Sequence, residues 1–583
     1  MKAYNEKKKK NKSQMIKTFV SISTFCLLVI IIFQIQPVKG ETESTSISIS
    51  IKGELSTITI PASVSTWIDT ELSKAKRKIL LTQKQFFTMD TAKVLGYING
   101  YKTDLGFNTV KIDVTNNLTK ESRPIISEID SLGRFICSIP MKHPQKLTIS
   151  FGEKFFSLYL EPGQALALSF DWDDCVKTNG FRDVKTPASI LFLKGPLAKL
   201  NYDLLSFQLK TLGYRHYWIM RTHTPLKYLA VMDSILVEND ALVNKALKDG
   251  SFSKKVIEIQ KNEALIANGF SLIDYASTKS EEGIQVPPNF YNMLQRLPLD
   301  DPSSIISFYA PFINRFEVNP VTIKAYRIVF EGKSDDLNFQ SLMESERCLM
   351  LWHKKDSLLG SDLKLSSSFA YETTKIRSLS NDIQNMGKDE AFAYYAKLRE
   401  GIKNPFLQQE GLRILSAHFG KEEIQRNDRE INIPKISSTL PKWIPLSIPK
   451  GRDAEIFSKL IAPYKGKYLF VDFWGTSCGP CRWGIEEKKE TREKYRNNDI
   501  FEFIFISCKT WSPNKNAYEK YVKEQGLEHS LFVSDDEFNY MMQLFRFTGV
   551  PHYLFIDPDG KVLDTDFEMF FEFDEAKKWI YEK

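Results

Sequence analysis

Three hydrophobic patterns follow one another along the chain. Up to about residue 185, short runs of alternating apolar and polar residues are separated by turn residues, for example at 93–101, 109–114, 146–151 and 165–170. Alternation with period two, interrupted at this spacing, is typical of the strands of a β-sandwich. We therefore predict a β-rich, sandwich-like N-terminal domain over residues 41–185, with a helix within 66–90.

From residue 186 the apolar residues recur at steps of three and four, which indicates helices. The clearest run has Thr224 as a candidate cap, Pro225 in its first turn and Gly250 just after its end. Further helical runs lie at 254–268, 322–331 and 390–400. We predict a helical middle domain over residues 186–431.

Residues 432–452 contain Pro434, Pro441, Pro445 and Pro449 and predict a semi-rigid linker. After it, strand and helix patterns alternate, which predicts an α/β sheet with helices on its faces over residues 453–583. We expect strands at 467–474, 501–507, 531–533, 551–556 and 561–564. We expect helices at 481–497, 514–525 (capped by Ser512), 537–545 and 574–581.

The charge of the chain is concentrated at its start. The 583 residues have a net charge of +7, and residues 1–40 alone hold eight lysines and one glutamate, leaving 71 basic and 71 acidic side chains after them. A neutral remainder without a basic stripe argues against nucleic-acid binding. With 42% hydrophobic and 26% charged residues the chain is an ordinary globular protein, neither disordered nor collagen-like.

The first forty residues have the order of an export signal, with lysines within 2–17 followed by a charge-free apolar stretch at 18–38. Cleavage before Glu41 and retention of 18–38 as a membrane anchor both remain open, since the stretch approaches the length of a bilayer span. In either case the positive-inside rule places everything after Glu41 outside the cytoplasm. We expect a periplasmic or cell-envelope protein that contacts the membrane only through an uncleaved leader.

The chemistry of the chain is concentrated in the sequence Cys478-Gly479-Pro480-Cys481. Between a strand and a helix, two cysteines at this spacing indicate a thiol–disulfide redox pair. A helix N-terminus lowers the pKa of a thiol there, and the second cysteine lies in the first turn, where it can resolve a mixed disulfide. Half of a zinc site and an inert disulfide are the alternatives. Because His529 and His552 stand alone, we expect no metal and no cofactor beyond a redox-active Cys478–Cys481 disulfide.

Residues 471–482, with the sequence Val-Asp-Phe-Trp-Gly-Thr-Ser-Cys-Gly-Pro-Cys-Arg, resemble the active-site strand and elbow of thioredoxins. Residues 461–467 and 549–561 resemble the exported TlpA/ResA branch of that superfamily, which includes multidomain proteins of Bacteroidetes-type bacteria. The specific resemblance covers about 455–583. Before that it is limited to weak patterns such as Gly-Arg-Phe at 133–135 and Leu-Glu-Pro-Gly at 160–163.

The resemblance implies roles for individual residues. Cys478 would be the attacking thiol, Cys481 the resolving thiol and Asp472 the buried acid that takes a proton from the latter. The residues themselves support the last role, because an aspartate inside an apolar strand is desolvated and its pKa rises. Pro551 corresponds to the family's cis-proline, and the backbone of Val550 would pair with an extended client.

Trp474 would pack beside the dithiol, and Arg482 would add positive charge near the thiolate. Surface cover and a solvated charge are the respective alternatives. The lysine that thioredoxins place near the buried acid is not evident in 501–507. Cys508 ends that strand and could form an alternative disulfide, and His552 either tunes the thiolate or is an ordinary strand histidine.

These observations predict an exported thiol–disulfide oxidoreductase that reduces disulfides in protein clients. The resemblance implies a membrane electron donor of the CcdA/DsbD type as its partner. A peroxiredoxin-like peroxidase shares the fold, but it uses a lone cysteine flanked by Thr and Pro. In a third hypothesis residues 51–430 bind a partner, and the redox domain only locks that complex.

Overall fold

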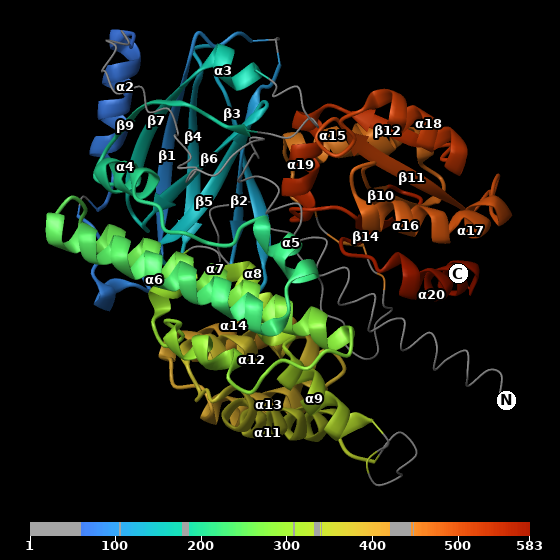
Figure 1. The fold of residues 1–583 in the computed structure, drawn as a ribbon. Helices are drawn as coiled ribbons and strands as arrows, with labels where there is room; N and C mark the ends of the chain where they lie inside the picture. The colour runs from blue at the N-terminus through green and yellow to red at the C-terminus, as the bar shows by residue number, and fades with distance from the viewer. Residues whose placement is uncertain are drawn as a thin grey trace.

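The computed structural model describes residues 60–582, except 78, 104–105, 178–185, 307–308, 332–338, 340, 420–442, 444 and 447. Two β-sheets stand above a layer of long helices, and a C-terminal α/β domain, coloured orange and red, lies beside the sheets (Figure 1). The predicted leader and most of the predicted linker lie outside the described residues. Within the described residues, no helix combines the length and apolarity needed to cross a bilayer.

The N-terminal region is a sandwich of two sheets. One has the order β4-β1-β7-β9 and the other β3-β2-β5-β6-β8. The first sheet consists of β1 (Asp90–Asn99), β4 (Arg134–Met141), β7 (Ala165–Asp171) and β9 (Ile190–Lys194). The second consists of β2 (Thr109–Thr115), β3 (Ser122–Glu128), β5 (Gln145–Phe151), β6 (Lys154–Leu160) and β8 (Thr186–Pro187). The strand-rich N-terminal region predicted from alternation is therefore present.

Both faces of β1 are buried, and successive side chains of the strand point into two different hydrophobic clusters. Val94 and Ile98 point into the main core, whereas Leu95 packs with Val64 and Ile68 of the helix α2 (Ala62–Ser73). A further short helix, α3 (Trp172–Val176), follows β7. Because β9 pairs with β7, the strand-rich region extends beyond the predicted boundary at 185 to the end of β9.

The helical region contains α4 (Ala198–Ser206), α5 (Arg215–Thr222), α6 (Pro225–Asp249), α7 (Lys254–Glu281), α8 (Tyr309–Glu317), α9 (Pro320–Phe330), α11 (Glu344–Leu363), α12 (Phe369–Asp382), α13 (Lys388–Glu400) and α14 (Pro405–Phe419). α6 begins at Pro225, and Gly250 ends it with a φ of 62°, as its sequence predicts. One continuous hydrophobic core runs from Phe86 to Leu415. The sandwich and the helices are therefore packed as one body rather than as separate cores.

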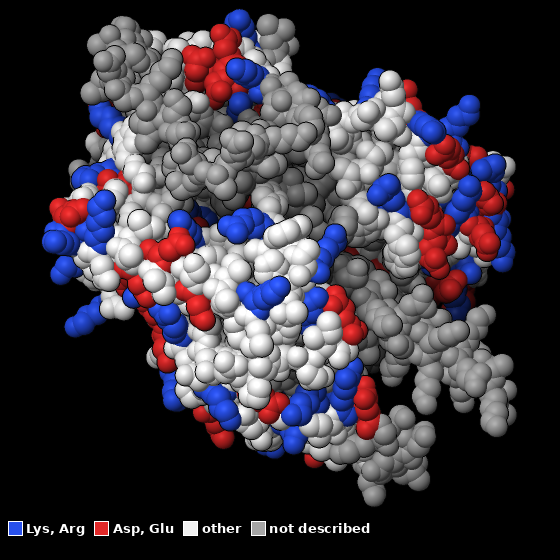
Figure 2. All heavy atoms as spheres, in the orientation of Figure 1, with Lys and Arg blue, Asp and Glu red and all other residues white. Residues whose placement is uncertain are grey.

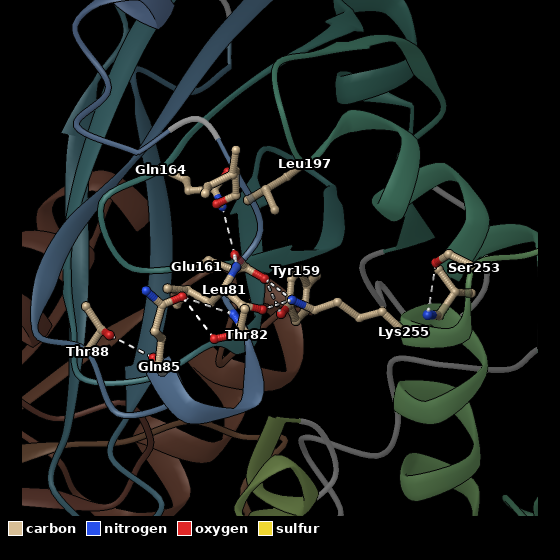
Figure 3. Close-up of polar contacts among 12 residues, drawn as sticks. Leu81, Thr82, Gln85, Thr88, Tyr159, Glu161, Gln164, Leu197, Ser253 and Lys255 are labelled. Atoms are coloured by element: carbon tan, nitrogen blue, oxygen red, sulfur yellow. Dashed lines mark hydrogen bonds and ion pairs between the residues drawn. The ribbon is translucent and has the colours of Figure 1, made fainter.

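A buried carboxylate joins these two regions (Figure 3). Glu161, within the Leu-Glu-Pro-Gly pattern, is fully buried and pairs with Lys255 of α7. Its oxygens also accept hydrogen bonds from Leu81 N at 2.7 Å, Tyr159 OH at 2.8 Å and Gln164 Nε2 at 2.7 Å. A charge with this many donors is fully satisfied in the core, so the group fixes α7 against the sandwich.

The C-terminal domain has one sheet of order β12-β11-β10-β13-β14. In it β10, β11 and β12 run parallel to one another, β13 runs antiparallel to β10, and β14 runs antiparallel to β13. Its strands are β10 (Tyr468–Phe473), β11 (Phe501–Cys508), β12 (Ser530–Val533), β13 (His552–Ile556) and β14 (Val562–Asp564). Its helices are α15 (Arg452–Ile461), α16 (Gly479–Glu487), α17 (Lys489–Lys494), α18 (Lys515–Gln525), α19 (Asp535–Phe545) and α20 (Met569–Glu582).

Side chains from both faces of β10 are buried, which explains its nearly continuous apolar sequence. Phe473 packs against Phe538 and Phe545 of α19, and Phe470 packs against Phe573 of α20. Helices therefore cover both faces, as the α/β pattern predicts. The packed domain also begins before residue 453, because Trp443 is buried against Phe555 and Trp579.

Two local details differ from expectation. The helix predicted at 481–497 is two shorter helices, α16 and α17, which meet at Lys488. α18 is capped by Asn514, whose side chain accepts from the backbone N–H of Ala517 at 3.0 Å, and not by Ser512. The Ser512 hydroxyl is instead used in the loop beside β10, where it accepts from the backbone N–H of Thr476 at 3.0 Å.

The C-terminal domain is attached to the sandwich through α19, which lies along the edge strand β3 (Figure 1). Asp536 at the start of α19 accepts hydrogen bonds from Asn108 N, at 3.0 Å, and from the hydroxyl of Thr109. Further along, Gln543 accepts from Ile126 N at 2.9 Å. On the face shown in Figure 2, basic and acidic side chains are interspersed over both the helical region and the C-terminal domain.

Candidate redox-active site

The two cysteines of the motif lie at the N-terminus of α16, directly after β10 and a short elbow. Cys478 is the N-cap residue, Gly479 and Pro480 occupy the first two helical positions, and Cys481 follows in the first turn. The two cysteines form a disulfide. Pro480 loses no helical hydrogen bond at this position, because the first N–H groups of a helix have no partner within it.

The elbow is held by the loop that follows β11. The backbone carbonyl of Trp511 accepts from the hydroxyl of Ser477 at 2.7 Å and from its N–H at 3.2 Å. A Cβ on Gly475 would lie 2.3 Å from the same carbonyl, so only glycine fits at this contact. The cysteines therefore stand on a turn whose position is fixed by a neighbouring loop rather than by the helix alone.

The electrostatics of the helix end favour a thiolate at Cys478. The N–H of Cys481 donates to Sγ of Cys478 at 3.1 Å. Unpaired N–H groups and the helix dipole stabilise negative charge at such a position, which lowers the pKa of a thiol in the reduced protein. Cys478 is 4% exposed and Cys481 is fully buried, so the outer sulfur is the more accessible of the two.

The loop between α19 and β13 lies against this sulfur. The peptide bond between Val550 and Pro551 is cis, and the carbonyl oxygen of Val550 lies 3.5 Å from Sγ of Cys478. Val550 is buried and Pro551 half-buried. The structure thus brings together the residues that the resemblance placed around the attacking thiol.

Asp472 lies on β10 between Phe505 of β11 and Tyr553 of β13. It is 5% exposed, and its Oδ1 has no hydrogen-bond partner among the described residues. Burial raises the pKa of Asp472 to about 8, and the nearby Arg492 acts in the opposite direction. A carboxyl with this pKa can exchange a proton near neutral pH, which is the requirement for a general base.

Trp474 and Arg482 occupy different environments. Trp474 is fully buried and stacks at 5.5 Å on Tyr518, so its side chain offers no surface to a client in this conformation. It does share the hydrophobic cluster that contains both cysteines. Arg482 is exposed on α16, as a solvated charge would be.

His552 and Cys508 are buried beside the site. His552 stacks on Phe547 at 4.1 Å, and burial lowers its pKa to about 3, so the imidazole is neutral at physiological pH. This environment is that of an ordinary strand histidine. Cys508 is a free thiol with 1% exposure, and burial raises its pKa. Among the described residues, no cluster of His, Cys, Asp or Glu is arranged to hold a metal ion.

Sequence reasoning missed Arg492 of α17. The lysine that the resemblance implies on β11, the strand next to Asp472, is absent from residues 501–507. The cation comes instead from α17, which follows α16, the redox helix that begins at the two cysteines. A single arginine among the many surface charges of α17 gives no signal in the sequence. Its burial, with 8% exposure, distinguishes it from those charges and is visible only in the folded chain.

Two loops that flank the dithiol elbow also contact the sandwich. Lys509, just after β11, pairs with Glu153 at 2.7 Å. The hydroxyl of Thr548, in the cis-proline loop, lies 3.1 Å from that of Ser122 at the start of β3. The sandwich is therefore positioned next to the redox site and not only next to the back of the domain.

Comparison with known proteins agrees with this geometry. A family model described as thioredoxin-like matches residues 466–562. The chain is 24% identical over 153 residues to the thiol–disulfide oxidoreductase ResA of Bacillus cereus, covering 26% of this chain and 76% of that protein. Its identity to ResA of Bacillus subtilis is 23% over 167 residues, covering 28% and 81%.

Among solved structures, a protein of Bacteroides vulgatus assigned as a thiol–disulfide oxidoreductase is 33% identical, with 20% of this chain and 74% of that chain covered and a TM-score of 0.18. The family-model match and the ResA relatives identify a thioredoxin-like domain at the C-terminus of this chain. Its thioredoxin-like domain is the C-terminal α/β domain, and the protein is an oxidoreductase. These matches cover between about a sixth and just over a quarter of the chain.

Proposed function

We propose that this protein reduces disulfide bonds in protein clients outside the cytoplasm, using Cys478 and Cys481 as its dithiol. The observation that carries the proposal is the position of Cys478. Its sulfur receives the N–H of Cys481, stands at the N-terminus of α16 and lies against the cis-proline loop. One sulfur is thereby both activated and placed beside backbone that an extended client can pair with.

The reaction has two exchange steps. The Cys478 thiolate attacks one sulfur of a client disulfide, so a mixed disulfide forms and the other client sulfur leaves as a thiolate. Cys481 then loses its proton and attacks Sγ of Cys478, which releases the second client sulfur. Two electrons pass to the client, and the Cys478–Cys481 disulfide of the present structure is the oxidised product.

Asp472 is the proposed acceptor of the Cys481 proton, because it is a buried carboxyl under the redox helix. Val550 and Pro551 are the proposed contacts for the client backbone, and Gly479 and Pro480 form the half-exposed surface between the two sulfurs. Trp474 supports this surface from within the core. No further cofactor is needed for the two exchange steps.

The oxidised protein must regain two electrons before the next client. The pattern of residues 1–40 supports export, and outside the cytoplasm a membrane donor of the CcdA/DsbD type is the proposed source. The relatives named ResA are thiol–disulfide oxidoreductases, which supports the same chemistry for this protein. Whether the leader is cleaved is answered by N-terminal sequencing of the mature protein.

The decisive experiment is a dithiol-dependent assay of insulin disulfide reduction. The wild-type protein should accelerate the reaction and Cys478→Ser should abolish the acceleration. Cys348→Ser is the matched control, because Cys348 is a free, half-buried thiol in the helical region. Equal activity of the wild type and Cys478→Ser would overturn the proposal.

Two other outcomes are separated by simple measurements. A peroxiredoxin-like enzyme would consume peroxide rapidly, and Cys-x-x-Cys does not match the single cysteine that such enzymes use. Mass mapping of the oxidised protein tests the involvement of Cys508. A pure Cys478–Cys481 bridge would eliminate the alternative disulfide.

A further inference from the structure

A cavity lies under the redox helix, on the face of the sheet that carries Asp472. Its volume is ≈ 20 Å³, which is enough for one water molecule. Gly484 and Ile485, in the turn of α16 that follows Cys481, form its roof, and Tyr553 lines its side. The cavity therefore lies between the turn of α16 that follows Cys481 and the carboxyl of Asp472.

Arg492 lines the same cavity and is held there by two backbone contacts. Its Nη1 donates to the carbonyl of Ile485 at 2.6 Å, and its Nη2 donates to that of Gln525 at 3.2 Å. The guanidinium lies 5.6 Å from the ring of Phe505, the strand partner of Asp472. The position of this cation is thus fixed by the roof helix, the end of α18 and the sheet.

Two buried polar atoms in this cavity have no partner in the described residues. They are Oδ1 of Asp472 and Nε of Arg492. An unpaired acceptor and an unpaired donor of opposite charge in one cavity are the two ends of a bridge that a single water can complete. Buried polar groups are rarely left unsatisfied without a functional reason.

We infer that Arg492 is the positioning residue for Asp472: its fixed positive charge keeps the carboxyl able to ionise when Cys481 resolves the mixed disulfide. The inference rests on the proposed function. It also accounts for the absence of the strand lysine, because here the cation arrives from a helix. An arginine stays protonated at all physiological pH values, so it sets the charge of the site without carrying the proton itself.

The other charged or titratable groups at the cavity act differently. Lys488 lines it, but its ammonium lies over the rings of Phe570 and Phe573, at 5.4 and 5.8 Å. The pKa of the Tyr553 phenol is raised well above its ordinary value, chiefly by burial, so it stays neutral. Arg492 is therefore the cation that acts directly on Asp472, and it opposes the rise that burial causes in the pKa of that carboxyl.

The test compares Arg492→Met with Arg492→Lys. In Arg492→Met the acid limb of the pH profile of the resolution step should move up by about one pH unit or more, because an opposite charge at this range lowers a carboxyl pKa by about that amount. At pH 7 the step should slow by about tenfold. Arg492→Lys should leave the limb close to that of the wild type, and Lys488→Met should move it less than Arg492→Met.

A second measurement does not depend on activity. The carboxyl carbon of Asp472, followed by NMR in the reduced protein, should titrate at higher pH in Arg492→Met than in the wild type. An unchanged titration in Arg492→Met, or the same shift in Arg492→Lys, would overturn the inference. If Arg492→Met does not fold, Arg492→Lys decides alone. An upward shift of about one pH unit or more in this variant, which keeps the positive charge, would contradict a role for charge. Failure of the proposed function would instead show as an inactive wild type, with the titration unaffected.

Discussion

The side-chain oxygen of Gln543 accepts a hydrogen bond from the backbone N–H of Ile126, at 2.9 Å. Ile126 belongs to β3, an edge strand of the sandwich, and Gln543 belongs to α19 of the thioredoxin-like domain. An uncovered edge strand is a template for unwanted pairing, and here α19 covers it. The thioredoxin-like domain is thereby held on the sandwich by a side chain of α19 and a backbone N–H of β3.

This contact predicts the exchange behaviour of one amide. In Gln543→Ala the N–H of Ile126 should exchange with solvent about five- to tenfold faster, because it loses a hydrogen bond worth about 1 kcal/mol. Hydrogen exchange resolved at the level of peptides or residues measures this. Unchanged protection in the alanine variant would mean that the contact contributes nothing to docking.

Removal of the resolving thiol should trap the reaction intermediate. In Cys481→Ser the mixed disulfide between Cys478 and a client cannot be resolved, so it should accumulate and be visible on non-reducing gels and by mass spectrometry. Cys478→Ser and the double variant should trap nothing. A client trapped on Cys508 in the double variant would show that Cys508 can attack the client, which would contradict the assignment of that attack to Cys478.

Asp472 should make stability depend on pH. Its folded pKa of about 8 lies above the value of about 4 in an unfolded chain. A carboxyl with a raised pKa contributes its stability fully below about pH 4, and that contribution is lost as the pH rises towards 8. Asp472→Asn should therefore be more stable than the wild type by a few kcal/mol at pH 8 and nearly equal to it at pH 4.

Urea unfolding of the oxidised protein at the two pH values measures this difference. The same variant should lose the acid limb of the resolution step, because asparagine cannot accept the proton. Parallel pH profiles of stability for the wild type and the asparagine variant would show that folding does not raise the pKa of Asp472, which would contradict its role as the proton acceptor.

The buried Glu161 should be far more costly to remove than a surface carboxylate. Glu161→Ala leaves Lys255 without its carboxylate and removes the acceptor of Tyr159 OH, so we expect a loss of about 3–5 kcal/mol in the free energy of unfolding. Asp203→Ala breaks the pair with the exposed Lys199 and should cost less than about 1 kcal/mol. Chemical denaturation compares the two, and similar losses would contradict the linking role of Glu161.

Much of the fold could be predicted because the local patterns were consistent with the tertiary structure. Period-two alternation located β1, β2, β5 and β7, and Pro225 with Gly250 gave both ends of α6. The alternating pattern after the linker gave the α/β domain. The boundaries were less accurate: β9 completes a sheet through pairing with β7, and no local signal assigns it to that sheet.

The sequence alone determined the dithiol. Two cysteines at this spacing, between a strand and a helix, have few chemical interpretations, and the spacing itself puts both sulfurs in one helical turn. The sequence also marked Asp472 as a desolvated acid, since an aspartate within an apolar strand is buried wherever that strand lies.

Only the tertiary structure decided what surrounds these groups. Arg492 reaches Asp472 from a different element, twenty positions along the chain by number, and α19 attaches the redox domain to β3 from a distant part of the sequence. A charge acts through space, and its effect depends on burial and distance. Neither quantity is encoded in a local pattern, so the counter-charge of Asp472 and the docking of the domains became visible only once the chain was folded.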